Sequence, residues 1–105
     1  MKLLLDECLP LDFRLSFPNH EAHTAQWAGL KGAKNGELPR AAEDAGYDVL
    51  LTVDRGIPHQ QRPTGRKLSI ILLHSRTNQI EDLLPLVGAI LRALETILPG
   101  QITAV

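Results

Sequence analysis

Apolar runs that stop at polar or acidic residues divide the chain into strand-sized pieces. The runs over residues 3–5, 49–53 and 68–73 are continuous instead of alternating, which predicts strands buried on both faces of a sheet. A weaker strand is expected over Glu21–Thr24, and residues 102–105 can form a strand at the sheet edge. The chain therefore has the strands of a small sheet that is covered on both sides.

A second pattern, with the period of a helix, fills the gaps between these strands. A short helix is expected after Pro10, and another over residues 37–45, closed by Gly46 as its C-terminal cap. Pro85 leaves two possible starts for the last helix: a cap at Asp82, or an earlier start near Ile80 followed by a kink. One broad apolar face of this helix comprises Leu83, Leu84, Val87, Ile90, Leu91, Leu94, Ile97 and Leu98.

Strands that alternate with helices indicate a parallel sheet with right-handed crossovers. The prediction is an α/β fold: a single three-layer α/β/α domain over residues 1–105, with a mainly parallel sheet of four to five strands. The expected strand order, numbered along the chain, is 2-1-3-4-5. Glycines at 29, 32 and 36 mark a loop over 26–36, and residues 58–66 form a second, polar loop.

Composition narrows the functional classes. Aromatic residues make up only 4% of the 105 residues, so the core must be aliphatic. The net charge of -1 argues against broad electrostatic attraction to a polyanion. A nucleic-acid ligand would need a local basic patch or a metal ion. The single cysteine excludes an intrachain disulfide. With no signal peptide and no membrane span expected, a cytoplasmic location is predicted.

Three acids are expected to meet at one edge of this sheet. Asp6 closes the first strand, Asp54 closes the third, and Glu37 opens the helix between them. If these strands are neighbours, their carboxyl ends lie about 5 Å apart. Carboxylates held together repel one another, and a divalent cation removes the conflict. Oxygen ligands suit Mg²⁺ or Mn²⁺, and such an ion can promote phosphodiester hydrolysis.

A structural interpretation of the same acids stays open at this point. Asp and Glu after a strand are common turn and helix-cap residues, and each of these acids taken alone fits such a role. The apolar strands that lead directly into Asp6 and Asp54 favour a metal site. The spacing alone does not decide between a metal site and a structural role.

Several short motifs resemble the short PIN-like family, in the same order and over nearly the whole chain. The matching segments are Lys2-Leu-Leu-Leu-Asp-Glu-Cys-Leu-Pro10, Trp27-Ala-Gly-Leu, Asn35-Gly-Glu-Leu, Leu50-Leu-Thr-Val-Asp54, Arg76-Thr-Asn and Glu81-Asp-Leu-Leu-Pro-Leu86. PIN domains are metal-dependent endoribonucleases, and many are VapC-type toxins paired with an antitoxin protein. The resemblance implies an Mg²⁺- or Mn²⁺-dependent RNA hydrolase, acting as the toxin of such a pair.

The resemblance also implies roles for individual residues. Asp6, Glu37 and Asp54 match the metal-binding and catalytic acids of the family, and Glu7 is a second candidate at the first position. PIN nucleases often carry a further acid two residues after the last of these, where this chain has Gly56. The departure implies a weaker metal site, and it leaves open a catalytically weakened module that binds RNA or a protein.

Basic and polar residues are expected in loops around the same edge. Lys34, Arg55, Arg62 and Arg76 are predicted to contact substrate phosphate, with a solvated rim as the alternative. His59 and Gln60 follow the acidic turn and are candidates for substrate contact as well. Their alternative role is to cap a helical turn.

The remaining reactive or aromatic side chains have mainly structural interpretations. His20 and His23 flank a strand without the spacing of a metal pair, whereas His74 ends a strand from which it could reach the acids. Cys8 is expected to be a buried small hydrophobe, because no partner base for nucleophilic catalysis is evident. Trp27 could stack on a base, but the preferred interpretation is that it plugs a loop against the core.

Two further possibilities follow from the fold class and the last helix. Acids at strand ends also suit a phosphate-accepting receiver domain, although the last strand lacks the lysine that receivers need. The long apolar helix makes a homodimer plausible, unless its whole apolar face is needed to cover the sheet.

Overall fold

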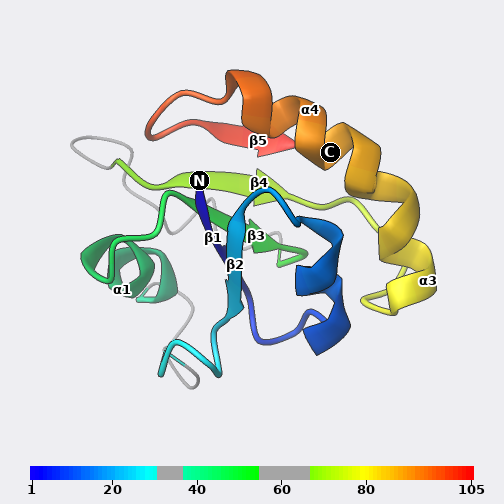
Figure 1. Cartoon of the computed structure of the whole chain (residues 1–105), viewed down its shortest axis with the longest axis horizontal. Helices are drawn as coiled ribbons and strands as arrows, with labels where there is room; N and C mark the ends of the chain where they lie inside the picture. The colour runs from blue at the N-terminus through cyan, green and yellow to red at the C-terminus, as the bar shows by residue number, and fades with distance from the viewer. Residues whose placement is uncertain (31–36, 55–66) are drawn as a thin grey trace.

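Within the residues that the structure describes, five short strands form one sheet, and every neighbouring pair in it is parallel (Figure 1). The computed structural model describes residues 1–30, 37–54 and 67–105. The strands are β1 (Lys2–Leu5), β2 (Glu21–Thr24), β3 (Val49–Thr52), β4 (Ser69–Leu72) and β5 (Ile102–Ala104). Their order, β2-β1-β3-β4-β5, confirms the order predicted from the sequence.

The continuous apolar strands are buried on both faces of the sheet, as predicted. Successive side chains of a strand point to opposite faces. Leu3, Leu5 and Leu51 accordingly belong to one apolar cluster, whereas Leu4 and Leu50 belong to a second cluster on the other side. Burial on two faces explains why these strands have no alternating polar positions.

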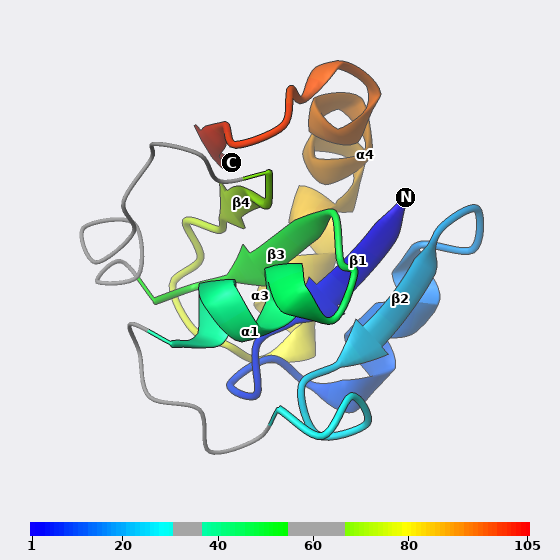
Figure 2. The same cartoon turned by 90° about the vertical axis from the view of Figure 1, so that its left-hand side faces the viewer.

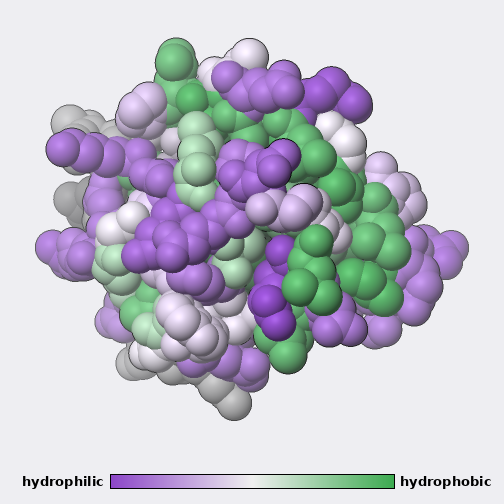
Figure 3. Space-filling model, viewed as in Figure 1, coloured by the Kyte–Doolittle hydropathy of each residue, from purple (hydrophilic) through white to green (hydrophobic). Residues whose placement is uncertain are grey.

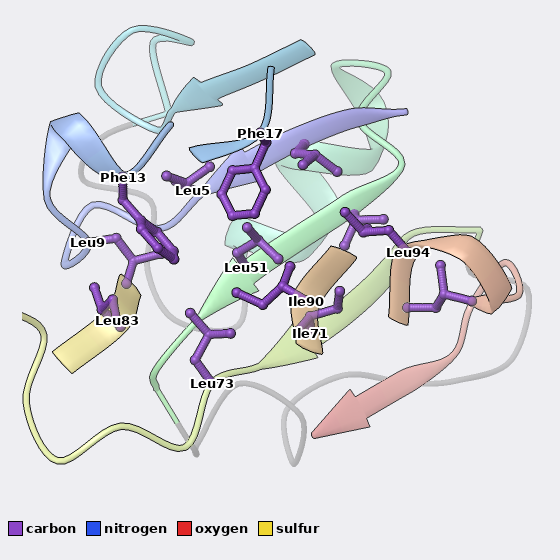
Figure 4. Close-up of a cluster of buried hydrophobic side chains, with 13 residues drawn as sticks. Leu5, Leu9, Phe13, Phe17, Leu51, Ile71, Leu73, Leu83, Ile90 and Leu94 are labelled. Atoms are coloured by element: carbon purple, nitrogen blue, oxygen red, sulfur yellow. The ribbon is translucent and has the colours of Figure 1, made fainter. Parts of the chain in front are cut away.

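Helices cover both faces and give the domain three layers (Figure 2). Helix α1 (Leu38–Asp44) packs on one face, where Leu38 and Ala42 join the second cluster. The other face is covered by the 3-10 helix η1 (Leu11–Ser16), by α3 (Ile80–Leu83) and by α4 (Val87–Thr96). Figure 4 shows Phe13, Leu83 and Ile90 from these elements pointing into the first cluster.

Pro85 interrupts the last helix instead of starting it. The helical segment begins at Ile80, passes through the 3-10 turn η2 (Leu84–Leu86) and continues as α4. A proline has no N–H to donate and its ring clashes with the preceding turn, so the regular helix is broken there. Of the two predicted starts, the earlier one is confirmed and a cap at Asp82 is wrong, because Gln79 occupies the N-cap position.

Most of the predicted apolar face of this helix is used to cover the sheet. Ile90, Leu94 and Ile97 are buried, whereas Leu84 and Leu98 remain exposed. The burial leaves only isolated apolar positions of this helix in contact with solvent.

The end of α1 follows the predicted glycine cap. Gly46 has a φ of 90°, in the left-handed region that favours glycine. Its N–H donates to the carbonyl of Glu43, and the N–H of Tyr47 donates to the carbonyl of Ala42. This pair of bonds is a Schellman motif, which turns the chain back into β3.

No helix in residues 1–30, 37–54 or 67–105 is long and apolar enough to cross a membrane.

We expect Leu51→Ala to lower the free energy of unfolding by about 2–5 kcal/mol, because it opens a cavity in the central strand of the sheet. Leu51 is fully buried, whereas Leu98, the matched control, is 67% exposed. Leu98→Ala should change the stability by less than about 0.5 kcal/mol. Urea unfolding followed by circular dichroism measures both values, and equal effects of the two changes would contradict the core described above.

Candidate functional site

The predicted acids lie at the carboxyl edge of the sheet. Strands β1 and β3 are neighbours, with Leu5 opposite Leu51, so Asp6 and Asp54 follow adjacent strand ends. Glu37 is the N-cap residue of α1, and the N-terminal end of this helix points toward the same edge (Figure 2). Ligands of open parallel sheets bind beyond this edge.

Asp6 is held in a buried and well-defined position. Its side chain is only 7% exposed, and its Oδ2 accepts a hydrogen bond of 2.7 Å from the hydroxyl of Thr52. Its N–H donates to the carbonyl of Leu51, and its own carbonyl accepts from the N–H of Leu9, which closes a tight turn. The carboxylate is therefore fixed by β3 and by its own loop.

Thr52 connects the two aspartates, although it was not among the predicted site residues. It is fully buried at the end of β3, and its hydroxyl oxygen accepts a hydrogen bond of 3.0 Å from the N–H of Asp54. One hydroxyl group thus bridges the Asp6 side chain and the Asp54 backbone. The signal available in the sequence was the single hydroxyl within an otherwise apolar buried strand.

The described residues do not form a complete metal cage. Within residues 1–30, 37–54 and 67–105, no group of three or more His, Cys, Asp or Glu side chains is placed to hold one ion. Glu7 and Glu37 are exposed, and the Glu37 side chain makes no capping bond to α1. Asp6 and Asp54 supply hard oxygen donors from adjacent strand ends, which suits Mg²⁺ or Mn²⁺ with water completing the coordination. The three-acid site stays a prediction.

Cys8 lies beside Asp6 and is protonated at neutral pH. Burial, the negative charge of Asp6 and a hydrogen bond to that carboxylate raise the pKa of the Cys8 thiol to about 11, although a hydrogen bond with the Val53 backbone opposes the rise. The side chain is half-buried and packs against the first apolar cluster. These observations agree with the predicted role as a small hydrophobe and not as a nucleophile.

The loop between β4 and α3 contacts the loop that follows β1. The side-chain amide of Asn78 donates to the carbonyl of Cys8 at 2.8 Å, which ties the turn before α3 to the loop after β1. Arg76 is exposed in that turn, and its contact with substrate phosphate stays a prediction. The other predicted substrate residues, which lie outside the described part of the chain, are Lys34, Arg55, His59, Gln60 and Arg62.

No protein-family model matches the sequence, and searches of curated proteins and of solved structures found no significant match. The PIN-like resemblance consequently stays a prediction from the motifs of the sequence. What the structure adds is the parallel α/β fold and the arrangement of residues at its carboxyl edge.

The preferred interpretation of Trp27 is wrong. Its side chain is 71% exposed and does not plug the loop against the core. It stacks on His23, and the ring centroids lie 4.0 Å apart. Backbone bonds hold the loop after β2: the N–H of Ala25 donates to the carbonyl of Leu5 in β1, and the N–H of Leu30 donates to the carbonyl of Ala25. The loop therefore does not need the indole as an anchor.

The other histidines occupy peripheral positions. His20 Nδ1 lies 3.3 Å from the terminal amine of Met1, at the opposite edge of the sheet from Asp6. His74 follows β4 at the carboxyl edge and is exposed. It contributes a backbone bond to Val105, which secures β5.

We expect Thr52→Val to lower the free energy of unfolding by about 1–3 kcal/mol, because it removes the hydrogen bonds of the Thr52 hydroxyl to the Asp6 carboxylate and to the Asp54 N–H. Thr52→Ser keeps the hydroxyl and is the matched control. Thermal unfolding followed by circular dichroism compares the two variants. A Val variant as stable as the Ser variant would show that the hydroxyl bridge contributes nothing to folding.

The thiol of Cys8 should react slowly with iodoacetamide at pH 8, where a pKa of about 11 leaves about one thiolate per thousand molecules. Asp6→Asn removes a negative charge that raises this pKa, so the rate should increase at the same pH. Burial persists, and the pKa should stay above its ordinary value. Alkylation rates measured by mass spectrometry across pH test this directly, since the chain has no other cysteine. An unchanged profile would place Asp6 too far away to act.

Proposed function

We propose that this protein is an Mg²⁺- or Mn²⁺-dependent endoribonuclease that hydrolyses RNA phosphodiester bonds at the carboxyl edge of β1 and β3. The observation that carries the proposal is the buried carboxylate of Asp6, linked through Thr52 to Asp54 on the adjacent strand. Within the described residues Asp6 forms no ion pair.

The electrostatics of Asp6 favour a cation as its partner. A buried carboxylate is costly unless it is paired or well hydrogen-bonded. The Thr52 hydroxyl supplies one hydrogen bond to one oxygen, and no Lys or Arg among the described residues neutralises the charge. A divalent ion at the sheet edge would neutralise the charge and leave positions for water and phosphate oxygens.

Each residue at this edge would have a separate role in the proposed metal site. Asp6 provides a rigid oxygen ligand, and Asp54 extends the ligand set from the neighbouring strand. Glu37, the exposed N-cap residue of α1, is the third candidate ligand at the same edge. Arg76 can bind a phosphate oxygen of the RNA. When bound, the ion would polarise the phosphoryl group and lower the pKa of an attacking water.

The biological setting rests on the motif resemblance. A nuclease toxin acts on cytoplasmic RNA and is held inactive by an antitoxin protein made beside it. We include both the antitoxin partner and the cytoplasmic location in the proposal.

A second candidate is a catalytically weakened module that binds RNA or a protein. The described residues lack a three-ligand metal group, and Gly56 stands where PIN nucleases often have an acid. With this candidate, binding would not depend on divalent ions.

A cleavage assay separates the two candidates. We expect the purified protein to cut labelled single-stranded RNA with Mg²⁺ or Mn²⁺ and to stop with EDTA. Asp6→Asn and Asp54→Asn should each reduce the rate at least about 100-fold, because each replaces a negatively charged carboxylate with a neutral amide, a weaker ligand for a divalent ion. Asp44→Asn, an exposed change of equal charge at the far end of α1, is the control and should leave the rate unchanged.

Full activity of Asp6→Asn would exclude the proposed site. Metal-independent RNA binding without cleavage, unchanged in both aspartate variants, would instead support the binding module.

A further inference from the structure

We propose that a groove along the outer edge of β2 binds one nucleotide of single-stranded RNA, with the base stacked on Trp27 and a phosphate held by Arg14. RNA as the ligand rests on the proposed function. The groove itself is separate from the carboxylates and makes no use of a metal ion.

The groove lies between η1 and the turn that follows β2. It encloses about 490 Å³, within the usual range for small-molecule sites. Figure 3 shows the face that carries β2 and η1, with hydrophobic surface gathered over η1 and α3 and hydrophilic surface beside it. The lining residues are Leu11, Arg14, Ala22, His23, Thr24 and Trp27.

Trp27 offers an aromatic surface to solvent that folding does not explain. The indole is 71% exposed, and His23 covers one of its faces at a centroid distance of 4.0 Å and an interplanar angle of 33°. The backbone N–H of Trp27 donates to the Thr24 hydroxyl, which fixes the residue at the end of β2. The opposite face of the ring is therefore available for a flat ligand, such as a base.

His23 is itself held in place, so the stacking surface is pre-formed. Its Nδ1 forms a hydrogen bond of 2.9 Å with the hydroxyl of Tyr47. Tyr47 is buried between α1 and β3, and the Nζ of Lys2 lies 4.7 Å from the centre of its ring. An aromatic surface that is ordered before binding loses less conformational entropy when a ligand arrives.

Arg14 adds the charge that a nucleotide requires. It is exposed on η1 and lines the same groove as Trp27. A guanidinium group binds phosphate oxygens through two parallel hydrogen bonds. An exposed aromatic ring paired with a cation is the combination that single-stranded nucleic-acid sites use, and it binds bases without strict sequence preference.

The groove is one strand away from the proposed catalytic edge. Thr24 of β2 lies opposite Leu5 of β1, the residue before Asp6, and adjacent strands are about 5 Å apart. An RNA strand with one base on Trp27 can thus present a neighbouring phosphate to Asp6. The inferred role is to position the RNA next to the cut.

The same edge could in principle accept a peptide strand or a second copy of the chain. β2 is only four residues long, and the N–H of Ala28 turns back onto the carbonyl of Thr24, which limits any added strand. The aromatic and guanidinium groups add nothing specific to strand pairing. These features favour a nucleotide over a peptide.

The intrinsic fluorescence of Trp27 reports directly on this groove, because it is the only tryptophan in the chain. We expect oligouridylate or oligoadenylate, added in EDTA, to quench this fluorescence in a saturable way. Trp27→Ala should weaken binding of labelled RNA, measured by anisotropy, by roughly tenfold or more, and Trp27→Phe should restore part of it. Arg14→Ala should weaken binding more than Arg92→Ala, an equal charge change on exposed α4.

Absence of quenching, or equal losses for Arg14→Ala and Arg92→Ala, would overturn the groove as a nucleotide site. It would also be overturned if Trp27→Ala converted a dimer to a monomer in sedimentation while RNA affinity stayed the same. Because binding is measured without metal, it does not depend on cleavage. RNA binding without cleavage would contradict the nuclease proposal and support the groove. Cleavage without quenching of Trp27 fluorescence would support the nuclease and contradict the groove.

Discussion

The parallel pairing of β1 with β3 is the constraint on which the rest of the structure depends. It pairs two strands that are far apart in the sequence, with Leu5 opposite Leu51. Both strands are apolar on their two faces, so each must be covered by helices on both sides. The polar residues that follow these two strands therefore lie at the carboxyl edge of the sheet.

At that edge, the polar residues Asp6 and Thr52 are buried. Asp6 is nearly as buried as the leucines before it, and the Thr52 hydroxyl is its hydrogen-bonding partner from the neighbouring strand. Burial and the charge of this carboxylate together raise the pKa of the adjacent Cys8 thiol. On the proposed function, a divalent cation would neutralise this buried negative charge.

The weak net charge of the chain fits recognition by local groups. A protein with a net charge of -1 has little long-range attraction for RNA. On the proposed function, binding would come from short-range contacts, and the Trp27–His23 pair with Arg14 would supply stacking and a phosphate partner in one groove. The proposed metal site and the proposed groove would both hold RNA through short-range contacts, and they lie at the ends of two adjacent strands.

The sequence by itself determined the strands, the end of α1 and the order of the sheet, because continuous apolar runs, Gly46 and the alternation of strand with helix act locally or through simple connection rules. It also placed Asp6, Glu37 and Asp54 at one edge. Only the tertiary structure decided that Thr52 bridges the aspartates, that Pro85 interrupts the helix after Ile80, and that Trp27 faces solvent on His23. Those outcomes depend on which side chains meet across strands and turns, and such meetings follow from packing in three dimensions that no local pattern encodes.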